Sequence, residues 1–154
     1  MTACTAQTCP AGQIASKSGA TTTDEGCQNC PAGKYSLGGS ATACLNMNCP
    51  SGQKSVKEGS TTATDGCGEC ALGSYSSGDD NTNCLPQVCP AGYKAAKTGA
   101  RTETDGCEIC PAGKYSAGGA ATSCSNMACP AGKIATLAGA STDIEGCTAC
   151  PIGK

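Results

Sequence analysis

The segment "CPAGKYSAGG", residues Cys110–Gly119, decides the fold class because it is one copy of a repeated phrase. Near-copies begin 40 and 80 residues earlier, with "CALGSYSSGD" at Cys70 and "CPAGKYSLGG" at Cys30. The 16 cysteines fall into four series that each advance by 40 residues, without insertion or deletion. This regularity predicts a one-dimensional array of like units.

Each 40-residue repeat divides into a long loop and a short loop that open with the same kind of motif. The long loop of the first repeat runs from Cys9 to Cys27, and the short loop runs from Cys30 to Cys44. Both begin Cys-Pro-x-Gly, carry a further glycine near the middle, and end at a cysteine. The chain therefore divides into the end of a preceding loop (1–8), three full repeats (9–48, 49–88 and 89–128) and an incomplete fourth repeat (129–154).

The composition requires covalent stabilisation. The chain lacks Phe, Trp and His, and only 12 of its 154 residues are Leu, Ile or Val. Burial of apolar area contributes roughly 25 cal/mol per Å², so this set is too small for an ordinary core. A content of 16 cysteines is typical of disulfide scaffolds, which form in oxidising compartments. We therefore expect a small disulfide-rich repeat array that is secreted or lies on a cell surface.

The local sequence predicts turns and short strands. Proline after cysteine favours an extended cysteine, and the glycine two residues later permits a positive φ, so Pro-Ala-Gly is typical of a tight turn. The segments "QIAS" and "KYS" then offer short extended stretches, and threonines precede an Asp-Gly turn in the long loops. The expected fold has short irregular β-ladders and turns, little or no helix, and the form of an elongated rod or superhelix.

The motif Cys-Pro-x-Gly-x-Tyr-Ser, followed by Gly and by Cys-x-x-Cys, resembles ephrin-receptor-like cysteine-rich repeats and the loops of tumour-necrosis-factor-receptor modules. Tandem arrays of this kind, rich in Thr, Ala and Gly, are similar to ciliate immobilisation antigens. The resemblance covers the whole chain, although the chain lacks the extra interlocked bridges of such receptors. It implies that each opening cysteine bonds the cysteine that closes its loop, which gives Cys9–Cys27, Cys30–Cys44, Cys49–Cys67, Cys70–Cys84, Cys89–Cys107, Cys110–Cys124 and Cys129–Cys147.

A second connectivity fits the same spacing. Pairing the first with the third and the second with the fourth cysteine of each block gives Cys4–Cys27 and Cys9–Cys30 and uses all 16 cysteines. Spacing alone leaves both schemes open. The first scheme leaves Cys4 and Cys150 as end-joining candidates, because residues 1–4 match the end of a short loop and residues 150–154 match its beginning. We expect the array to continue past both ends, in a longer chain or by head-to-tail contact of copies.

Metal and redox sites are the main alternatives to disulfides for the cysteines. The spacing of Cys27, Cys30, Cys44 and Cys49 suits a zinc site, and Cys-x-x-Cys recurs as in thiol-redox motifs. The Gly, Thr and Ala composition and the symmetry of the two loops favour disulfides over zinc, and four copies in register without a predicted helix argue against redox catalysis. The chain has no histidine to act as a base, and no carboxylate pair recurs in a hydrophobic setting. We expect no catalytic residue, no metal and no cofactor.

Other recurring side chains are expected to be structural. Tyr35, Tyr75 and Tyr115 recur every 40 residues and are expected to pack over a disulfide or loop backbone, with an exposed stacking face for a sugar or protein as the alternative. Acidic residues near the end of each long loop are expected to form turns, because one or two carboxylates make a poor calcium cage. These residues are Asp24, Glu25, Asp65, Asp105, Asp143 and Glu145.

The expected function is structural and non-enzymatic: an extracellular surface coat, stalk or self-associating fibre, with the chain itself as its main partner. The alternative is a receptor-like or adhesive ectodomain for a protein or glycan, for which Tyr93 and Arg101 interrupt the repeat. A net charge of −2 argues against nucleic acid as a partner, and this segment has no apolar stretch long enough to span a membrane. Candidate O-glycan sites are Thr21, Thr22, Thr23, Thr61, Thr62, Thr64, Thr102, Thr104 and Thr142.

Overall fold

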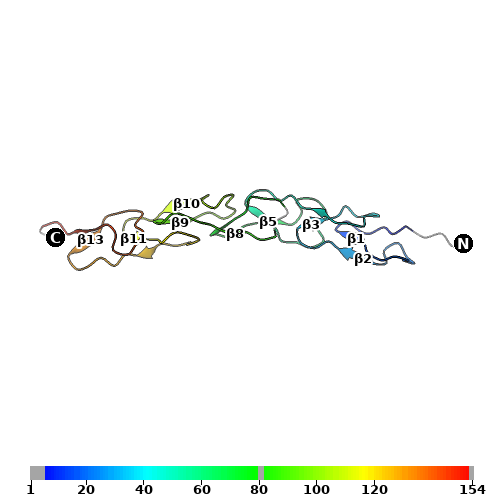
Figure 1. The fold of residues 1–154 in the computed structure, drawn as a ribbon, viewed down its shortest axis with the longest axis horizontal. Helices are drawn as coiled ribbons and strands as arrows, with labels where there is room; N and C mark the ends of the chain where they lie inside the picture. Colours follow the sequence, from blue (N-terminus) through cyan, green and yellow to red (C-terminus); the bar gives the residue numbers. More distant parts are fainter. Residues whose placement is uncertain (1–5, 80–81, 153–154) are drawn as a thin grey trace. The chain divides into compact units, whose positions relative to one another are not determined.

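The computed structural model describes residues 6–79 and 82–152. In this part of the chain it contains short strands, turns and no helix, and thus no helix that could cross a membrane (Figure 1). The strands are β1 (Gln13–Ala15), β2 (Cys27–Asn29), β3 (Lys34–Tyr35), β4 (Leu45–Asn46), β5 (Gln53–Ser55), β6 (Cys67–Glu69), β7 (Ser74–Tyr75), β8 (Leu85–Pro86), β9 (Tyr93–Ala95), β10 (Cys107–Ile109), β11 (Lys114–Tyr115), β12 (Ser125–Asn126), β13 (Lys133–Ala135) and β14 (Cys147–Ala149).

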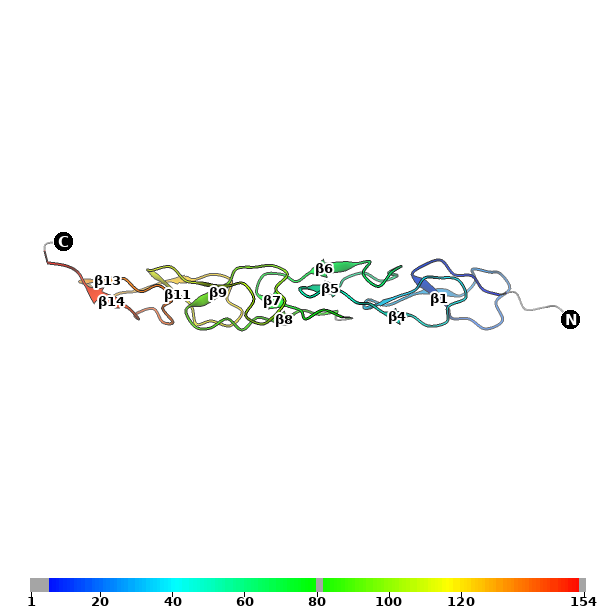
Figure 2. The same ribbon diagram turned by 90° about the horizontal axis from the view of Figure 1, so that it is seen from above.

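Consecutive strands pair into seven antiparallel two-stranded hairpins within the described residues. The four long hairpins pair three residues on each strand, as in β5–β6, where Lys54 lies opposite Gly68 (Figure 2). The three short hairpins pair two residues, as in β3–β4, where Tyr35 lies opposite Leu45. Isolated two-stranded hairpins are marginal in water, so these ladders need further support. The prediction of short ladders within each loop is confirmed.

Disulfides close the successive hairpins along the chain. Each closed loop is local, with a sequence separation of 18 in the long hairpins and 14 in the short ones. The cysteines Cys70 and Cys84 are also disulfide-bonded. The pairing agrees with the one that the receptor-module resemblance implies, and the alternative with Cys9–Cys30 is wrong. The bridges are Cys9–Cys27, Cys30–Cys44, Cys49–Cys67, Cys89–Cys107, Cys110–Cys124 and Cys129–Cys147.

A tight turn opens every hairpin, as the Pro-x-Gly motif predicts. In the first hairpin the Gln13 N–H donates to the Pro10 carbonyl at 3.1 Å, and Gly12 at the third turn position has a φ of 87°. A β-turn with a positive φ at this position favours glycine. Ala71 replaces proline in the fourth hairpin, and the Ser74 N–H still donates to its carbonyl at 3.0 Å. Glycine is therefore the decisive residue of the turn.

The chain forms two compact units. The first unit comprises Met1–Glu69 and Ser76–Cys84, and the second comprises Cys70–Tyr75 and Leu85–Lys154. The first unit thus holds the β1–β2, β3–β4 and β5–β6 hairpins. The second unit holds the β7–β8, β9–β10, β11–β12 and β13–β14 hairpins. Each unit contains both types of hairpin in alternation.

Within the first unit, main-chain hydrogen bonds join each hairpin to the next. Cys9 and Gly39 exchange two bonds of 2.8 Å, and the Gly12 N–H donates to the Ser36 carbonyl at 2.7 Å. The Ser36 N–H in turn donates to the Ser60 carbonyl of the following long hairpin at 3.1 Å. These bonds satisfy the edge groups that an isolated hairpin would leave to water.

The second unit repeats this scheme with equivalent residues. Cys89 bridges to Gly119, and the Gly92 N–H donates to the Ser116 carbonyl at 2.8 Å. The Ser116 N–H then donates to the Ala140 carbonyl at 3.1 Å. Equivalent residues therefore make equivalent contacts, which is the expected property of a repeat array.

Small residues and sulfur atoms fill the interior in place of large apolar side chains. Cys30, Cys70 and Cys110 are completely buried, as are Ala100 and Ala140. Buried serines accept hydrogen bonds from glycine N–H groups two residues later, at 3.0 to 3.1 Å; the pairs are Ser36–Gly38, Ser76–Gly78 and Ser116–Gly118. The prediction that disulfides replace an apolar core is consistent with this interior.

Glycines also permit close contact between successive long hairpins. An ideal Cβ on Gly12 would lie 2.2 Å from the Gly59 carbonyl oxygen, and one on Gly92 would lie 2.1 Å from the Gly139 oxygen. Gly132 occupies the same place in the last long hairpin and has nothing within 4 Å of its ideal Cβ. The three opening-turn glycines share a positive φ of 80° to 87°.

The variants Gly92→Ala and Gly132→Ala separate backbone strain from steric conflict. Both place a Cβ at positive φ, which costs about 1–2 kcal/mol. Gly92→Ala adds overpacking against a carbonyl, which typically costs a further ~1–3 kcal/mol. Amide hydrogen exchange of dilute protein in urea measures the free energy of unfolding. This free energy should fall further in Gly92→Ala than in Gly132→Ala. Equal losses in the two variants would contradict the close contact at Gly92.

Candidate functional site

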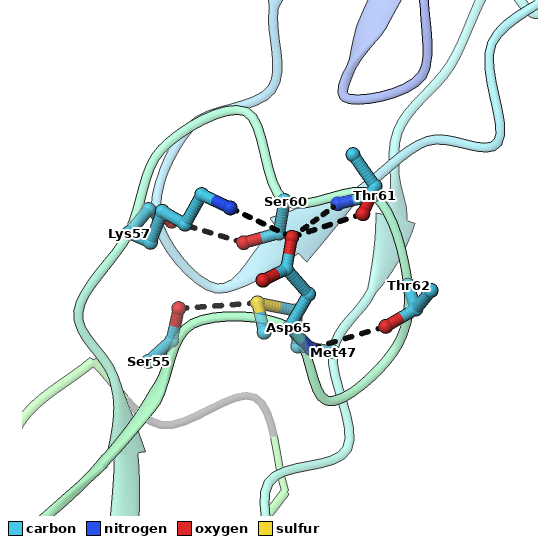
Figure 3. Close-up of polar contacts among 7 residues, drawn as sticks. All are labelled: Met47, Ser55, Lys57, Ser60, Thr61, Thr62 and Asp65. Carbon is cyan, nitrogen blue, oxygen red and sulfur yellow. Dashed lines mark hydrogen bonds and ion pairs between the residues drawn. The ribbon is translucent and has the colours of Figure 1, made fainter.

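Each long hairpin carries a carboxylate shortly before its closing cysteine, and that carboxylate accepts hydrogen bonds from its own loop. In the hairpin of β5 and β6, Asp65 Oδ2 accepts from Lys57 Nζ at 2.8 Å (Figure 3). It also accepts from the Thr61 N–H at 3.1 Å and from Thr61 Oγ1 at 3.0 Å. We call Lys57, Thr61 and Asp65, together with their equivalents in the other long hairpins, the carboxylate clamp.

The first and third long hairpins contain the same clamp with different residues. Glu25 accepts from Lys17 Nζ, and its second oxygen accepts from the Thr21 N–H at 2.7 Å. Asp105 accepts from Lys97 Nζ and from the Arg101 N–H, both at 2.9 Å. The clamp thus accepts either Glu or Asp as its carboxylate. Either Thr or Arg can stand at the donor position, because the donor is the backbone N–H.

The fourth long hairpin has a reduced clamp. Glu145 Oε2 accepts from the Ser141 N–H at 2.6 Å and from its hydroxyl at 2.5 Å. Leu137 replaces the lysine of the other copies. The backbone contact therefore persists where the ion pair is lost.

A glycine follows each clamp carboxylate and leaves room for the side chain that packs over it, which is a lysine in three copies and Leu137 in the fourth. An ideal Cβ on Gly66 would lie 2.4 Å from Lys57 Cβ, and Gly66 has a φ of 87°. A larger residue would displace the lysine stem that packs over this position. This explains why the acidic residue is followed by glycine in all four long hairpins.

The clamp lowers the pKa of Asp65, Asp105 and Glu145. The pKa of Asp65 falls to about 2, chiefly through the Lys57 hydrogen bond and then through the Thr61 N–H. The pKa of Asp105 is lowered by the hydrogen bond from Lys97 and then by the Arg101 N–H. The Ser141 hydroxyl and then its N–H lower the pKa of Glu145. These three carboxylates therefore stay ionised to a lower pH than free carboxylates of their type.

A buried polar cluster lies beside the clamp of the second long hairpin. The Ser55 hydroxyl accepts from the Gly33 N–H at 2.8 Å. It donates to Met47 Sδ at 3.1 Å (Figure 3). Gln87 is the equivalent of Met47 in the next repeat, and its Nε2 donates to the Asp105 carbonyl at 2.7 Å. Met47 thus contacts strand β5 of the long hairpin that follows it, whereas Gln87 contacts the far turn of its own following hairpin.

The acidic residues act within turns, as the sequence predicts. Glu25, Asp65, Asp105 and Glu145 each accept hydrogen bonds from residues of their own loop. The described residues contain no group of three or more His, Cys, Asp or Glu arranged to hold a metal ion. The carboxylates serve loop closure in this structure.

The zinc and redox alternatives for the cysteines do not fit the structure. Cys27, Cys30 and Cys49 each bond a different partner in a separate disulfide, so they do not form a common thiolate cluster. The two cysteines of one Cys-x-x-Cys motif do not bond each other: Cys27 and Cys30 belong to different bridges, and Cys147 bonds Cys129 while Cys150 is free. These motifs are joints between consecutive hairpins.

The tyrosines contribute to hairpin contacts through their backbone. Tyr35 forms a parallel bridge with Ser60, and Tyr115 forms one with Ala140. Tyr35, Tyr75 and Tyr115 are all half-buried, in agreement with a packing role. Tyr93 is half-buried in β9, whereas Arg101 is exposed and joins the clamp through its N–H.

The threonines proposed for glycosylation lie in the turns of the long hairpins. The hydroxyls of Thr21 and Thr61 donate to clamp carboxylates. Thr61 is half-buried, and the others are exposed: Thr21, Thr22, Thr23, Thr62, Thr64, Thr102, Thr104 and Thr142. O-glycosylation of these residues stays a prediction.

Of the two cysteines expected to join chain ends, only Cys150 lies within the described residues. Cys150 is a free, half-buried thiol whose N–H donates to the Gly132 carbonyl at 2.9 Å. That bond reproduces the one from Cys30 to Gly12, so Cys150 already occupies its repeat position. Cys4 lies outside the described residues.

A groove of about 460 Å³ is present in the second unit. Lys94, Glu108 and Ile109 line one part of it, and Lys114 and Cys124 line another. The Lys94 and Glu108 side chains form an ion pair of 3.3 Å. The groove combines apolar and cationic side chains near Tyr93, whereas Arg101 does not line it.

Sequence reasoning missed the clamp lysines and the buried serines. Lys17, Lys57 and Lys97 recur every 40 residues, eight positions before their carboxylates, so the repeat itself contained the signal. Ser36, Ser76 and Ser116 recur in the same way. Both patterns resemble ordinary exposed loop polarity when the sequence is considered alone.

No model of a known protein family matches the chain, and no curated protein matches its sequence. The repeat is therefore defined by its structure, which has seven tandem disulfide-closed hairpins of about 20 residues in the described part of the chain. The likeness to receptor modules rests on the Cys-Pro-x-Gly motif and on the local cysteine pairing.

The variant Asp65→Asn tests the clamp through its pH dependence. A lowered carboxylate pKa contributes stability above the unfolded pKa, near 4, and this contribution is lost as pH falls through the folded value of about 2. At neutral pH the variant should unfold at lower urea concentration than the parent, and its Thr61 amide should exchange faster. The difference should shrink between about pH 4 and pH 2.

Glu58→Gln is the matched control, because Glu58 is exposed in the same hairpin. It removes one negative charge without touching the clamp. An equal shift in Glu58→Gln and Asp65→Asn would show that net charge causes the effect. A pH-independent difference for Asp65→Asn would contradict the ion pair.

Proposed function

We propose that this chain is a non-enzymatic structural repeat protein of the extracellular space, used in a surface coat, a stalk or a self-associating fibre. The observation that carries the proposal is the recurrence of one hairpin-to-hairpin hydrogen bond. It joins Gly12 to Ser36 at 2.7 Å, and it joins Gly52 to Ser76 and Gly92 to Ser116 at 2.8 Å. Each repeat thereby joins its long hairpin to its short hairpin in the same way.

The disulfides support the proposed location. Local bridges close the hairpins, and such bridges persist in oxidising surroundings. A cytosolic chain with reduced thiols would lose the covalent closure of ladders that are only two or three residues long. The fold therefore suits secretion or display on a cell surface.

The polar groups of the long hairpins support a mechanical role. The clamp carboxylates bond within their own loops, and the buried serines bond backbone N–H groups. These side chains stabilise the turns, and their oxygens accept hydrogen bonds from the backbone of the same loop. A material built from such units gains length by addition of repeats, with stability set by neighbouring contacts.

Immunogold electron microscopy of intact producing cells tests this function. Antibodies against the folded chain should label an outer layer or extracellular fibres without permeabilisation of the cells. The same antibodies should label less after the disulfides in the section are chemically reduced, because the folded epitope is then lost. Label confined to the cytosol would contradict the proposal.

Recognition of a glycan or protein is the second candidate, and the groove in the second unit favours it. Lys114 supplies positive charge beside the apolar Ile109, whereas Lys94 is paired with Glu108 in the same groove. The ligand class that fits is an anionic glycan or an acidic peptide, which would contact both surface types.

Binding to a glycan array compares Lys114→Ala with Lys34→Ala, its counterpart in the first repeat. If the groove is a binding site, Lys114→Ala should lose most of the signal from anionic glycans and Lys34→Ala should keep it. Equal binding by both variants and the parent would rule the groove out as the binding site.

A further inference from the structure

Successive long hairpins meet through a pair of complementary edges. The forward edge consists of the opening-turn glycine and the carbonyl of the cysteine just after the hairpin, as in Gly12 and Cys30. The backward edge consists of the mid-loop glycine of the next long hairpin, as in Gly59. The Gly59 N–H donates to the Cys30 carbonyl at 2.8 Å, and the Gly59 carbonyl lies against Gly12.

The second unit contains the same pair of edges. The Gly139 N–H donates to the Cys110 carbonyl at 2.7 Å, and the Gly139 carbonyl lies against Gly92. The forward glycines Gly12 and Gly92 are buried by this contact. Two independent copies therefore define one repeated interface made of main-chain groups.

The forward edge of the fourth long hairpin is uncovered. Gly132 is exposed, and its ideal Cβ has nothing within 4 Å. Cys150 is half-buried, whereas Cys30 and Cys110 are fully buried. The Cys150 carbonyl has no hydrogen-bond partner among residues 6–79 and 82–152.

The backward edge of the first long hairpin is uncovered as well. Gly19 is exposed with a φ of 72°, and its ideal Cβ also has nothing within 4 Å. Its N–H finds no partner in the described part of the chain. The adjacent Ala20 is half-buried, whereas the equivalent residues Ser60 and Ala140 are fully buried.

We propose that these two edges bind each other between copies of this chain. The Gly19 N–H of one copy donates to the Cys150 carbonyl of another, and the Gly19 carbonyl lies against Gly132. The proposal rests on the self-associating form of the proposed function and names its interface. Because the two edges differ, the contact is head-to-tail, and repetition of it gives an open filament or a closed ring.

A second copy is the occupant that fits, because one chain carries both halves of an interface whose hydrogen bond recurs at Gly59, Gly99 and Gly139. The residue just before the cysteine of the forward edge lies beside the glycine of the backward edge. Its side chain differs in size between copies, and the contact forms in both. An ideal Cβ on Gly59 would lie 3.6 Å from Asn29, and one on Gly139 would lie 3.0 Å from Ile109. The equivalent residue beside Cys150 is the exposed Ala149, which is smaller than either. Gly19 therefore meets no bulky side chain at this site.

Sedimentation velocity and amide hydrogen exchange test the contact in a Cys4→Ser/Cys150→Ser background. This background excludes covalent dimers and keeps the main-chain carbonyl of residue 150. The chain should associate as its concentration rises, and the Gly19 amide should become protected in parallel.

Two variants block the edges one at a time. Gly132→Asn and Gly19→Asn fill the open space with a residue that tolerates positive φ, so the fold should survive. Each should weaken association about tenfold or more, which corresponds to the loss of roughly one hydrogen bond with its packing. Gly119→Asn is the matched control, because Gly119 has open space at a φ of 70° and Asp79 occupies the equivalent position at 72°. Dispersed amide spectra identify the variants that remain folded.

Three results would overturn the inference. The first is a chain that stays monomeric at millimolar concentration while its Gly19 amide exchanges as freely as in dilute protein. The second is association that both asparagine variants leave unchanged. The third is a loss in only one variant, since the contact needs both edges. None of these results bears on immunogold localisation, so failure of the interface is distinguishable from failure of the structural function.

Discussion

Local covalent closure is the constraint on which the rest of this structure depends. Ladders of two or three residue pairs provide too few hydrogen bonds to persist alone. Closing a loop of about 15 residues stabilises it by roughly 3 kcal/mol in the chain-entropy model. With each hairpin held in this way, its turn glycine and edge N–H groups keep fixed positions. The main-chain bonds from Gly12 to Ser36 and from Ser36 to Ser60 can then form without help from a large apolar core.

Small residues become an advantage once the hairpins are closed. Gly12 and Gly92 bring backbone against backbone, and Ser36 and Ser116 fill narrow interior sites while satisfying a neighbouring N–H. The carboxylate clamp adds a second local constraint at the opposite end of each long hairpin. Its replacement of Lys by Leu137 in the last copy shows that the backbone contact, rather than the ion pair, is the recurring element. A repeat with these features transmits its geometry to the next repeat through the main chain.

The fold class could be predicted from the sequence because its strongest signals are local. Cysteine spacing and the Pro-x-Gly turn act within about 20 residues, and the receptor-module resemblance implies the pairing that the structure shows. The clamp was harder to predict, because the approach of Lys57 to Asp65 depends on the curvature of the turn between them. The contact of Gly12 with Gly59 joins different repeats, and a glycine in a sequence does not reveal which backbone lies against it. The candidate function rests on main-chain contacts between hairpins, which local sequence patterns do not reveal, so the sequence supported it only in outline.

The central claim is that local disulfides replace the apolar core, and a comparison of oxidised and reduced chains tests it most directly. Amide spectra and hydrogen exchange would be recorded in the absence of denaturant, before and after reduction and alkylation. The account predicts a dispersed spectrum with protected Cys9 and Gly39 amides in the oxidised chain, and a collapsed spectrum without protection in the reduced chain. A reduced chain that keeps its dispersion and the protection of these amides would contradict the account.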